Sequence, residues 1–263
     1  MAQPVIALLS DFGLVDHYVG SMKGVALGIC LEAALVDITH QIEPHDILTG
    51  AIELQASYRY FPAGTIFLAV VDPGVGAGRR GLAAEAGDYR FVAPDNGVLS
   101  GVFEVTPPKR VVELTERRYA RPTVSRTFEG RDRFAPAAAW LAKGIQLTAL
   151  GRPVSSWETI AIPKAAVEAD GIAGEVLRVD RFGNLVSNIG HDAFDHLAQS
   201  GTIQITAGEH NIEKLVQTYA EAEPGEVCAL FGSTDHLEIS VNGGSAAERL
   251  GLARGASVEV ARA

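Results

Sequence analysis

The chain has 263 residues, of which 47% are hydrophobic and 21% charged, and its formal net charge is −10. This length and composition predict a globular protein of one large or two modest domains. The acidic balance, with no Lys/Arg run longer than two residues, argues against nucleic acid and anionic membranes as partners and favours a small-molecule substrate. There is no basic leader and no apolar stretch near the ~20 residues of a membrane span, so we expect a cytoplasmic protein.

Apolar periodicity predicts alternating strands and helices in the first part of the chain. Strands are expected at residues 5–9, 35–38, 65–71, 91–93 and 111–114. Helices are expected at residues 18–29, about 46–60 and 133–149. Asp46 is the expected N-cap of the second helix, and Pro136 lies in the first turn of the third, where proline is tolerated. This alternation predicts an N-terminal α/β domain over residues 1–160, with a mostly parallel sheet flanked by helices.

The character of the sequence changes after residue 160. Residues 161–171 combine proline, charge and glycine with little periodicity, which predicts a linker. Short strand-like runs, most of them separated by turn residues, follow at residues 175–179, 185–189, 202–207, 226–231, 237–241 and 257–261. They predict a C-terminal all-β, barrel-like domain over residues 172–263.

Residues 65–81 are the most informative segment, because an apolar strand is followed by Asp72, three alternating glycines and Arg79. Glycine lets the backbone approach a ligand closely, so the loop is similar to the first motif of Rossmann-type methyltransferases, and residues 76–81 satisfy the dinucleotide pattern GxGxxG. Those motifs require a helix after the glycines, whereas a Gly-Asp turn between two apolar runs here predicts a hairpin. The loop indicates a nucleotide-like ligand, with the Rossmann reading and a plain glycine-rich surface turn as alternatives.

The histidine and cysteine residues predict neither a metal site nor a disulfide framework. His40 and His45 are five positions apart, but the interval crosses a strand end and Pro44, so no metal site is predicted. Cys30 and Cys228 lie far apart in apolar segments, and we expect reduced, buried thiols.

Six motifs occur in order along the chain and together resemble one family. They are Ser10-Asp-Phe-Gly13, Val71-Asp-Pro-Gly-Val-Gly76 with Arg79, Ala93-Pro-Asp-Asn-Gly97, Thr127-Phe-Glu-Gly-Arg-Asp132, Asp180-Arg-Phe-Gly-Asn184 and Gly232-Ser233. They are similar to those of the S-adenosyl-L-methionine hydroxide adenosyltransferases, relatives of the fluorinase and chlorinase enzymes. The resemblance implies an N-terminal α/β domain, a C-terminal β-barrel, and a homotrimer whose sites lie between one subunit's first domain and its neighbour's second.

The resemblance also implies a reaction, the hydrolysis of S-adenosyl-L-methionine to adenosine and L-methionine by attack of water or hydroxide at the ribose C5′. The sulfonium is already a good leaving group, so no metal or cofactor is expected, and the protein must align the nucleophile and exclude competing water. Family members place an Asp, an Arg and a His around this water. Carried over, Asp72 accepts the water's hydrogen bond and Arg79 holds the developing hydroxide. A carboxylate at residue 72 is expected to repel a halide.

The third member of this catalytic group departs from the family pattern. Many relatives have TFHGRD where this chain has Glu129 in place of the histidine. A second carboxylate near Asp72 would be a further proton acceptor and could preserve base catalysis. An ion pair between Glu129 and Arg79 could instead hold the guanidinium away from water, leaving a catalytically weak S-adenosyl-L-methionine- or adenosine-binding protein, a very slow enzyme, or an adenosyltransferase that prefers a different nucleophile. An exposed loop acid is the structural alternative.

Two of the carried-over substrate contacts concern the sugar. Asp11 follows the first predicted strand, where the resemblance implies that its carboxylate accepts both ribose hydroxyls. Its structural alternative is to cap the next helix. His45 stands where relatives have an aromatic residue beside the sugar.

Four further contacts lie in the second domain. Asp180 and Ser233 match positions that hold the amino and carboxylate ends of the methionine moiety, and Asn184 matches one whose amide reads the adenine edge. The segment from Asp180 to Asn184 also predicts a β-turn. Tyr219 aligns with an aromatic residue that stacks on the base, with rim packing as its structural alternative.

Overall fold

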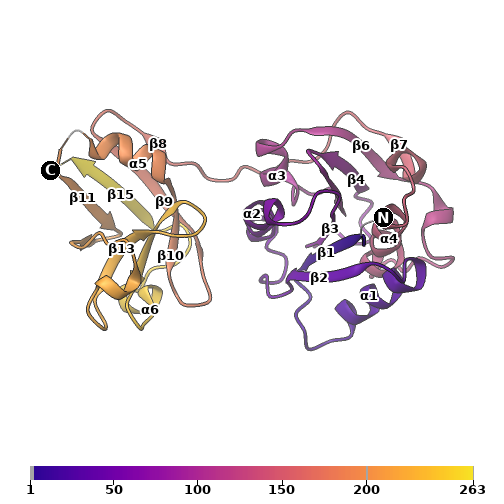
Figure 1. Ribbon diagram of the computed structural model, residues 1–263, viewed down its shortest axis with the longest axis horizontal. Coiled ribbons are helices and arrows are strands. Elements are labelled where there is room, and N and C mark those ends of the chain that lie inside the picture. Colours follow the sequence, from indigo (N-terminus) through magenta and orange to yellow (C-terminus); the bar gives the residue numbers. More distant parts are fainter. Residues whose placement is uncertain (1–2, 200, 263) are drawn as a thin grey trace. The chain divides into compact units, whose positions relative to one another are not determined.

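A computed structural model of the protein describes residues 3–199 and 201–262 (Figure 1). The chain forms two units, one ending at Ile162 and one beginning at Pro163. This division falls inside the stretch predicted as a linker, residues 161–171.

The N-terminal unit is built on a seven-stranded sheet with the strand order β2-β1-β3-β5-β4-β6-β7. The strands are β1 (Val5–Ser10), β2 (Ala34–Thr39), β3 (Ile66–Val70), β4 (Gly81–Ala86), β5 (Tyr89–Pro94), β6 (Pro108–Leu114) and β7 (Gly151–Pro153). Strands β2, β1, β3 and β5 run parallel to one another, whereas β4, β6 and β7 add antiparallel pairs. β3 is buried along its whole length, as expected for a parallel strand covered on both faces. The predicted α/β fold is confirmed.

Helices cover both faces of this sheet (Figure 1). They are α1 (Tyr18–Ile29), α2 (Ile47–Ser57), α3 (Ser100–Val105) and α4 (Ala135–Ala142), with short 3-10 helices η1 (Tyr58–Tyr60), η2 (Arg117–Tyr119) and η4 (Leu147–Leu150) and the π-helical turn η3 (Gly130–Phe134). Ile6 and Leu8 of β1 pack in the core cluster that contains α1 and α4, whereas Ala7 and Leu9 pack in the cluster that contains α2 and α3. The alternation of side chains along a strand produces these two cores.

Two of the three predicted helices of this unit are confirmed, and the third is shorter than expected. α1 has the predicted bounds, and Asp46 caps α2 by accepting a hydrogen bond from the backbone of Thr49 at 3.1 Å. The predicted helix at 133–149 is wrong at its C-terminal end, because α4 stops at Ala142. Gly144 has a φ of +94°, which ends the helix, although the alanine and leucine content of the segment favours a longer one.

The glycine-rich loop is followed by a hairpin of β4 and β5, with Gly87 at a φ of +58° in its turn. A strand therefore stands where a dinucleotide or methyltransferase motif needs a helix N-terminus. The Rossmann interpretation of the loop is wrong for this reason.

The C-terminal unit is a nearly closed antiparallel sheet, which confirms the predicted barrel-like domain. Its strand order is β12-β11-β15-β9-β10-β14-β13, and β8 pairs with β9. The elements are β8 (Ala166–Val167), β9 (Gly171–Val179), β10 (Leu185–Gly190), α5 (His191–Ala198), β11 (Ile203–Ala207), β12 (His210–Ile212), η5 (Tyr219–Glu221), β13 (Val227–Phe231), β14 (His236–Val241), α6 (Ala246–Leu250) and β15 (Ser257–Arg262). β8 lies in the stretch predicted as a linker. The sequence analysis missed α5, a short helix that buries Phe194 and Leu197 in the core.

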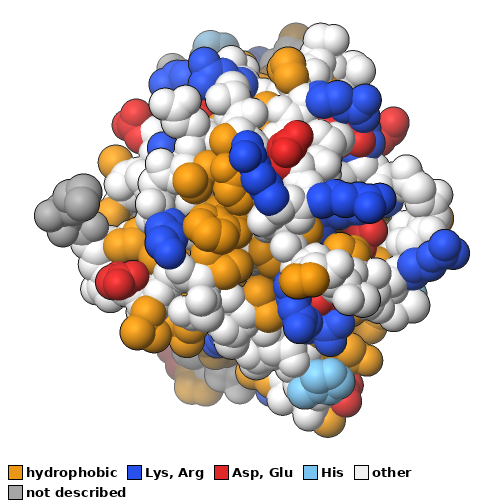
Figure 2. Space-filling model, turned by 90° about the vertical axis from the view of Figure 1, so that its right-hand side faces the viewer, with side chains coloured by type: hydrophobic (Ala, Val, Ile, Leu, Met, Phe, Trp, Pro, Cys, Tyr) orange, Lys and Arg blue, Asp and Glu red, His pale blue; other side chains and the backbone are white. Residues whose placement is uncertain are grey.

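The structure can be compared with the sequence in three further respects: the state of the cysteines, the length of apolar helices and the charged side chains on one face. Cys30 and Cys228 are both buried and free, as expected. No helix within residues 3–199 and 201–262 is both long and apolar enough to cross a membrane. On the face shown in Figure 2, Lys and Arg side chains lie around an apolar patch, with Asp and Glu side chains between them.

The packing of β3 predicts that truncating Phe67 lowers the stability of the protein strongly. The ring of Phe67 is fully buried and contacts Tyr58 and Phe91. We expect Phe67→Ala to lower the free energy of unfolding by about 3–5 kcal/mol, because it leaves a cavity in a close-packed core. The control Tyr60→Ala removes a side chain from a residue that is 81% exposed, and should change stability by less than about 0.5 kcal/mol. Urea unfolding measures both values, and equal losses would contradict the packing.

Candidate active site

The carboxyl ends of β1 and β3 meet at one edge of the N-terminal sheet. Ser10 of β1 pairs with Val70 of β3, so Asp11 and Asp72 follow the ends of neighbouring strands. The order β2-β1-β3 makes this the place where the chain connections change face, because α1 follows β1 on one face and α2 packs on the other. Ligands of open α/β sheets bind in the crevice at such a point.

Arg79 lies between two carboxylates at this edge. Its Nε donates to Oδ1 and Oδ2 of Asp72 at 2.8 and 3.0 Å, and its Nη2 also donates to Oδ2. Its Nη1 donates to Oε2 of Glu129 at 2.5 Å. The side chains of Arg79, Asp72 and Glu129 are 11%, 4% and 12% exposed. The structure thus brings the three predicted catalytic residues together, and the interpretation of Glu129 as an exposed loop acid is wrong.

Packing fixes the guanidinium between these carboxylates. Its central carbon lies 5.0 Å from the ring centroid of Phe134, in cation–π geometry. Burial opposes the positive charge of Arg79, but the hydrogen bonds and charges of Asp72 and Glu129 outweigh it and raise the pKa of Arg79 above its usual value. Arg79 is therefore a permanent cation with a fixed orientation.

The glycine-rich loop packs closely against the segment before Glu129. Gly76 has a φ of +78°, and a Cβ atom there would lie 2.5 Å from the backbone oxygen of Arg126. A side chain at Gly81 would likewise meet the ring of Phe134 at 2.6 Å. These glycines allow one piece of backbone to approach another, which places Arg79 beside Glu129.

The hydrogen bonds of this cluster leave groups available for a ligand. A guanidinium carries five N–H donors, of which Arg79 uses one on each nitrogen, so one N–H remains on Nη1 and one on Nη2. Both oxygens of Asp72 accept from Arg79, whereas Oε1 of Glu129 receives no hydrogen bond from the residues that the structure describes. Arg133 adds a more distant charge, with its Nη1 3.8 Å from Oε2 of Glu129.

Asp11 and His45 also lie together. The backbone N–H of His45 donates to Oδ2 of Asp11 at 2.9 Å, and His45 adopts a φ of +72°, which is uncommon for a residue with a side chain. The helix-capping alternative for Asp11 is wrong, because α1 has His17 at its N-cap and no side-chain cap. Asp11 instead joins the loop after β1 to the loop after β2.

A buried network around His40 supports the same two loops. Its Nδ1 lies 2.7 Å from the hydroxyl oxygen of Ser10, its Nε2 lies 3.0 Å from Oδ1 of Asp37, and its backbone oxygen accepts from the N–H of Gly13 at 2.7 Å. Both ring nitrogens are thus engaged in hydrogen bonds. Within the described part of the chain, no group of three or more His, Cys, Asp or Glu side chains could hold a metal ion.

An aromatic cluster connects the Asp11 loop with the Glu129 turn. Phe12 and Phe128 have ring centroids 6.0 Å apart, and the ring of Tyr18 lies 5.8 Å from the first and 5.1 Å from the second. Because Phe12 follows Asp11 and Phe128 precedes Glu129, the cluster holds both polar residues at one end of the sheet.

Other polar residues near this edge hold the surrounding backbone in place by hydrogen bonds within the N-terminal unit. Asp132 is fully buried and accepts hydrogen bonds from Arg131 at 2.7 Å, Arg121 at 3.1 Å and the backbone of Ser125 at 2.8 Å. Burial raises the pKa of Asp132, but these hydrogen bonds outweigh it and hold the pKa below its usual value. Asn96 donates to the backbone oxygen of Val71 at 2.8 Å and so fixes the end of β3.

The four predicted contacts of the second domain line one cavity of about 890 Å³ in the C-terminal unit. Asp180 accepts hydrogen bonds from the backbone of Phe182 and from the backbone and side-chain amide of Asn184, each at 2.9 Å, so the predicted turn is confirmed. Asn184 is buried, Ser233 is exposed, and Tyr219 is partly exposed. These side chains place carboxylate, amide, hydroxyl and aromatic groups on the wall of one cavity.

Glu238 of β14 also lines this cavity, and the sequence analysis missed it. It is only 6% exposed and accepts a hydrogen bond from the hydroxyl of Tyr219 at 3.0 Å. Leu237 and Ile239 face the core, and strand alternation then leaves Glu238 on the opposite face, where a glutamate usually meets solvent. Only the tertiary position of the segment around Tyr219 shows that this carboxylate is covered.

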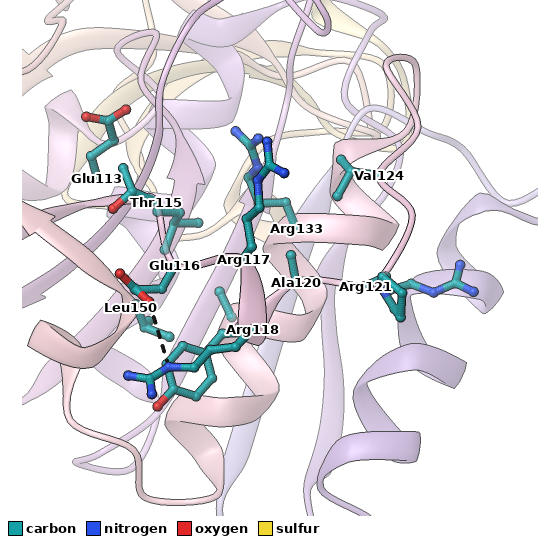
Figure 3. A pocket seen from close by; sticks show the side chains of 14 residues that line it. Glu113, Thr115, Glu116, Arg117, Arg118, Ala120, Arg121, Val124, Arg133 and Leu150 are labelled. Carbon is teal, nitrogen blue, oxygen red and sulfur yellow. Dashed lines mark ion pairs between the residues drawn. The ribbon is translucent and has the colours of Figure 1, made fainter.

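A second cavity, of about 720 Å³, lies in the N-terminal unit and is lined by residues 113–122 and Arg133, among others (Figure 3). Its arginines are largely paired, as in the ion pair of Arg118 with Glu116 at 3.8 Å. It contains none of the predicted site residues, but Arg133 connects its wall with Glu129.

The chain thus joins a doubly wound sheet, whose switch point holds a buried arginine between two carboxylates, to an antiparallel β domain with a cavity lined by polar and apolar side chains. The sequence models described as the SAM hydroxide adenosyltransferase N-terminal and C-terminal domains match residues 6–151 and 174–259. The chain belongs to the SAM hydroxide adenosyltransferase family.

Named relatives are similar in sequence to almost the whole chain. A protein of Salinispora tropica named (R)-S-adenosyl-L-methionine hydrolase is 38% identical over 260 residues, covering 98% of this chain and 97% of its own. A protein of Thermus thermophilus with the same name is 38% identical over 264 residues, covering 97% and 98%. A fluorinase of Actinopolyspora mzabensis is 27% identical over 293 residues, covering 99% and 98%. The crystal structure of an uncharacterized conserved protein from Thermotoga maritima, 36% identical, superposes with a TM-score of 0.93 over 98% of this chain and 100% of that one.

The hydrogen bonds and ion pairs of Asp132 predict that its contribution to the free energy of unfolding depends on pH. We expect Asp132→Asn to cost about 3 kcal/mol at neutral pH, because it leaves Arg131 and Arg121 without their buried partner. The pKa of Asp132 is lowered by folding, so its contribution is present above the unfolded pKa of about 3.9 and is lost as the pH falls through the lower folded value. Urea unfolding at neutral pH and at about pH 3.5 should therefore show a smaller difference in acid.

The matched control is Asp170→Asn, since Asp170 pairs with Arg262 at the surface and is 85% exposed. It should change stability by less than about 0.5 kcal/mol at either pH. A deficit of Asp132→Asn that stays constant with pH would contradict the assigned role of its charge.

Proposed function

We propose that this chain hydrolyses S-adenosyl-L-methionine to adenosine and L-methionine by attack of water at the ribose C5′. The observation that supports this most directly is the buried guanidinium of Arg79, which Asp72 and Glu129 hold at the switch point of the sheet with two N–H donors still available. The full-length similarity to relatives named (R)-S-adenosyl-L-methionine hydrolase supports the same substrate.

The hydrogen bonds favour a division of roles between the two carboxylates. Asp72 engages Arg79 with both oxygens, so in this proposal it orients the cation. Glu129 uses one oxygen and keeps Oε1 for a proton. In the proposed step, a water accepts from the remaining N–H groups of Arg79 and gives a proton to Oε1 of Glu129 as its oxygen bonds to C5′. The C5′–S bond breaks with its electron pair on sulfur, and methionine leaves as a neutral thioether.

The other predicted residues supply binding in this proposal. Asp11 accepts the ribose hydroxyls beside His45, and the C-terminal cavity takes the rest of the substrate through Asp180, Asn184, Ser233 and Tyr219. That these contacts lie in two separate units supports a homotrimer in which neighbouring subunits complete each site. We further propose that no cofactor is needed, because the sulfonium requires no activation, and that the enzyme is cytoplasmic, in keeping with its two free thiols.

A second candidate, a protein that binds S-adenosyl-L-methionine without turnover, is favoured by one observation. The ion pair between Glu129 and Arg79 that this alternative requires is present at 2.5 Å. The free Oε1 and the two unused N–H donors favour hydrolysis over it, because a closed pair would leave no group for water. Use of chloride or fluoride is disfavoured, because two carboxylates around one arginine repel an incoming anion.

Substitution at Glu129 tests the proposal. The wild-type protein should convert S-adenosyl-L-methionine to adenosine and methionine in equal amounts, measured by liquid chromatography. Glu129→Gln keeps the shape but loses the basic oxygen, so we expect kcat to fall by about 10²–10⁴ with little change in affinity. Glu129→His should retain activity, because histidine also accepts a proton and is the residue expected from the family motif.

The control for this series is Glu116→Gln, since Glu116 is a half-exposed carboxylate of the other cavity and should leave kcat unchanged. Full activity of Glu129→Gln would remove Glu129 from the proton transfer. Binding of S-adenosyl-L-methionine without any adenosine, in wild-type protein, would establish the binding-only alternative instead.

A further inference from the structure

Glu238 lies outside the set of residues that the family resemblance assigns to the substrate, although it forms part of the C-terminal cavity wall. Its Oε2 accepts the hydroxyl of Tyr219 at 3.0 Å. Its Oε1 receives no hydrogen bond from the described residues. A Cβ atom at Gly232 would lie 1.8 Å from Oε1, so a glycine at this position is what leaves room for the carboxylate. The cavity therefore contains a buried carboxylate with one oxygen free for a partner.

Charges of both signs act on the carboxylate of Glu238. Burial and the nearby charge of Asp180 raise its pKa, whereas the hydrogen bond of Tyr219 and the charges of Arg178 and His236 lower it, and the net direction is upward. Burial and the carboxylate of Glu238 raise the pKa of Tyr219 to about 12, so its hydroxyl keeps the proton that it donates. The cavity wall thus carries two carboxylates, Asp180 and Glu238, and one guanidinium, Arg178, and the free Oε1 of Glu238 is a site for a further cationic donor.

We propose that Glu238 binds the α-ammonium group of the substrate's amino-acid moiety, next to Asp180. This inference rests on the proposed function, since it assigns a residue that binds the amino-acid end of S-adenosyl-L-methionine. That substrate carries two cationic groups, the sulfonium at the reacting carbon and the ammonium. The amino group of adenine is neutral and compensates a buried carboxylate less well than a charged ammonium does.

The proposal gives Glu238 a role in specificity. A ligand with an amino-acid head supplies the cation that the buried carboxylate lacks, whereas a nucleoside thioether without that head does not. S-Adenosyl-L-homocysteine and 5′-methylthioadenosine form a suitable pair of probes. Both are uncharged at sulfur and have no sulfonium leaving group, so they differ in the presence of the amino-acid head and are not consumed during a titration.

Calorimetric titration of the full-length protein with these two probes tests the proposal. Glu238→Gln should weaken S-adenosyl-L-homocysteine by about 10–100-fold, because it removes the charge that pairs with the ammonium, and should change 5′-methylthioadenosine by less than about 2-fold. Glu259→Gln, at an exposed position of β15, is the matched control and should alter neither affinity. Tyr219→Phe should weaken S-adenosyl-L-homocysteine by less than about 3-fold, since the carboxylate remains.

Equal weakening of both probes by Glu238→Gln would overturn the proposal, because Glu238 would then act on the nucleoside or through Tyr219. Unchanged affinity for both would overturn it as well. The two proposals can fail separately. If Glu238→Gln selectively weakens S-adenosyl-L-homocysteine but the wild-type protein does not hydrolyse S-adenosyl-L-methionine, the role of Glu238 is supported and the proposed function is removed.

A second measurement uses only the wild-type protein and so does not depend on the folding of a variant. Burial raises the pKa of Glu238, and an arriving ammonium favours the charged carboxylate and so lowers that pKa again. Titrations at a series of mildly acid pH values, each in two buffers of different ionisation enthalpy, should show proton release with S-adenosyl-L-homocysteine that 5′-methylthioadenosine does not produce. Equal proton release with both probes, or none with either, would overturn the proposal.

Discussion

The guanidinium of Arg79, buried between the carboxylates of Asp72 and Glu129, is the interaction on which the proposed site depends. A cation that is nearly removed from solvent is stable only where paired and hydrogen-bonded, and here both carboxylates meet that need. The same pairing fixes the direction of the remaining N–H groups of Nη1 and Nη2, which bind water in the proposed mechanism. Stability and the proposed chemistry thus depend on one set of contacts.

The sheet topology explains why these groups meet. Asp72 follows β3, Asp11 follows the neighbouring β1, and Glu129 reaches them because the glycine-rich loop packs against the backbone before it. Aromatic contacts between Phe12 and Phe128 add a second link between the two sides. The proposed catalytic group is therefore assembled by close backbone approach at the end of parallel strands.

Much of this could be predicted from the sequence, where local patterns determine the outcome. The α1 helix, the Asp46 cap and the hairpin after the glycine loop follow from periodicity, capping chemistry and turn residues. The early end of α4 and the short α5 helix depend on single turns, which composition does not reveal. The division of roles between Asp72 and Glu129 and the burial of Glu238 depend on which oxygen atoms are already engaged, and only the three-dimensional structure shows that.

Glu129, which stands where the family resemblance leads us to expect histidine, pairs with Arg79, whose charge balances the additional carboxylate. A crystal structure of the protein with adenosine and methionine would test the central claim most directly. The account predicts an ordered water or the adenosine 5′-oxygen within about 2.7–3.2 Å of both Arg79 and Oε1 of Glu129, opposite the sulfur across C5′. A nucleoside bound with C5′ far from Arg79, or a closed Arg79–Glu129 pair with no oxygen atom beside it, would contradict the account.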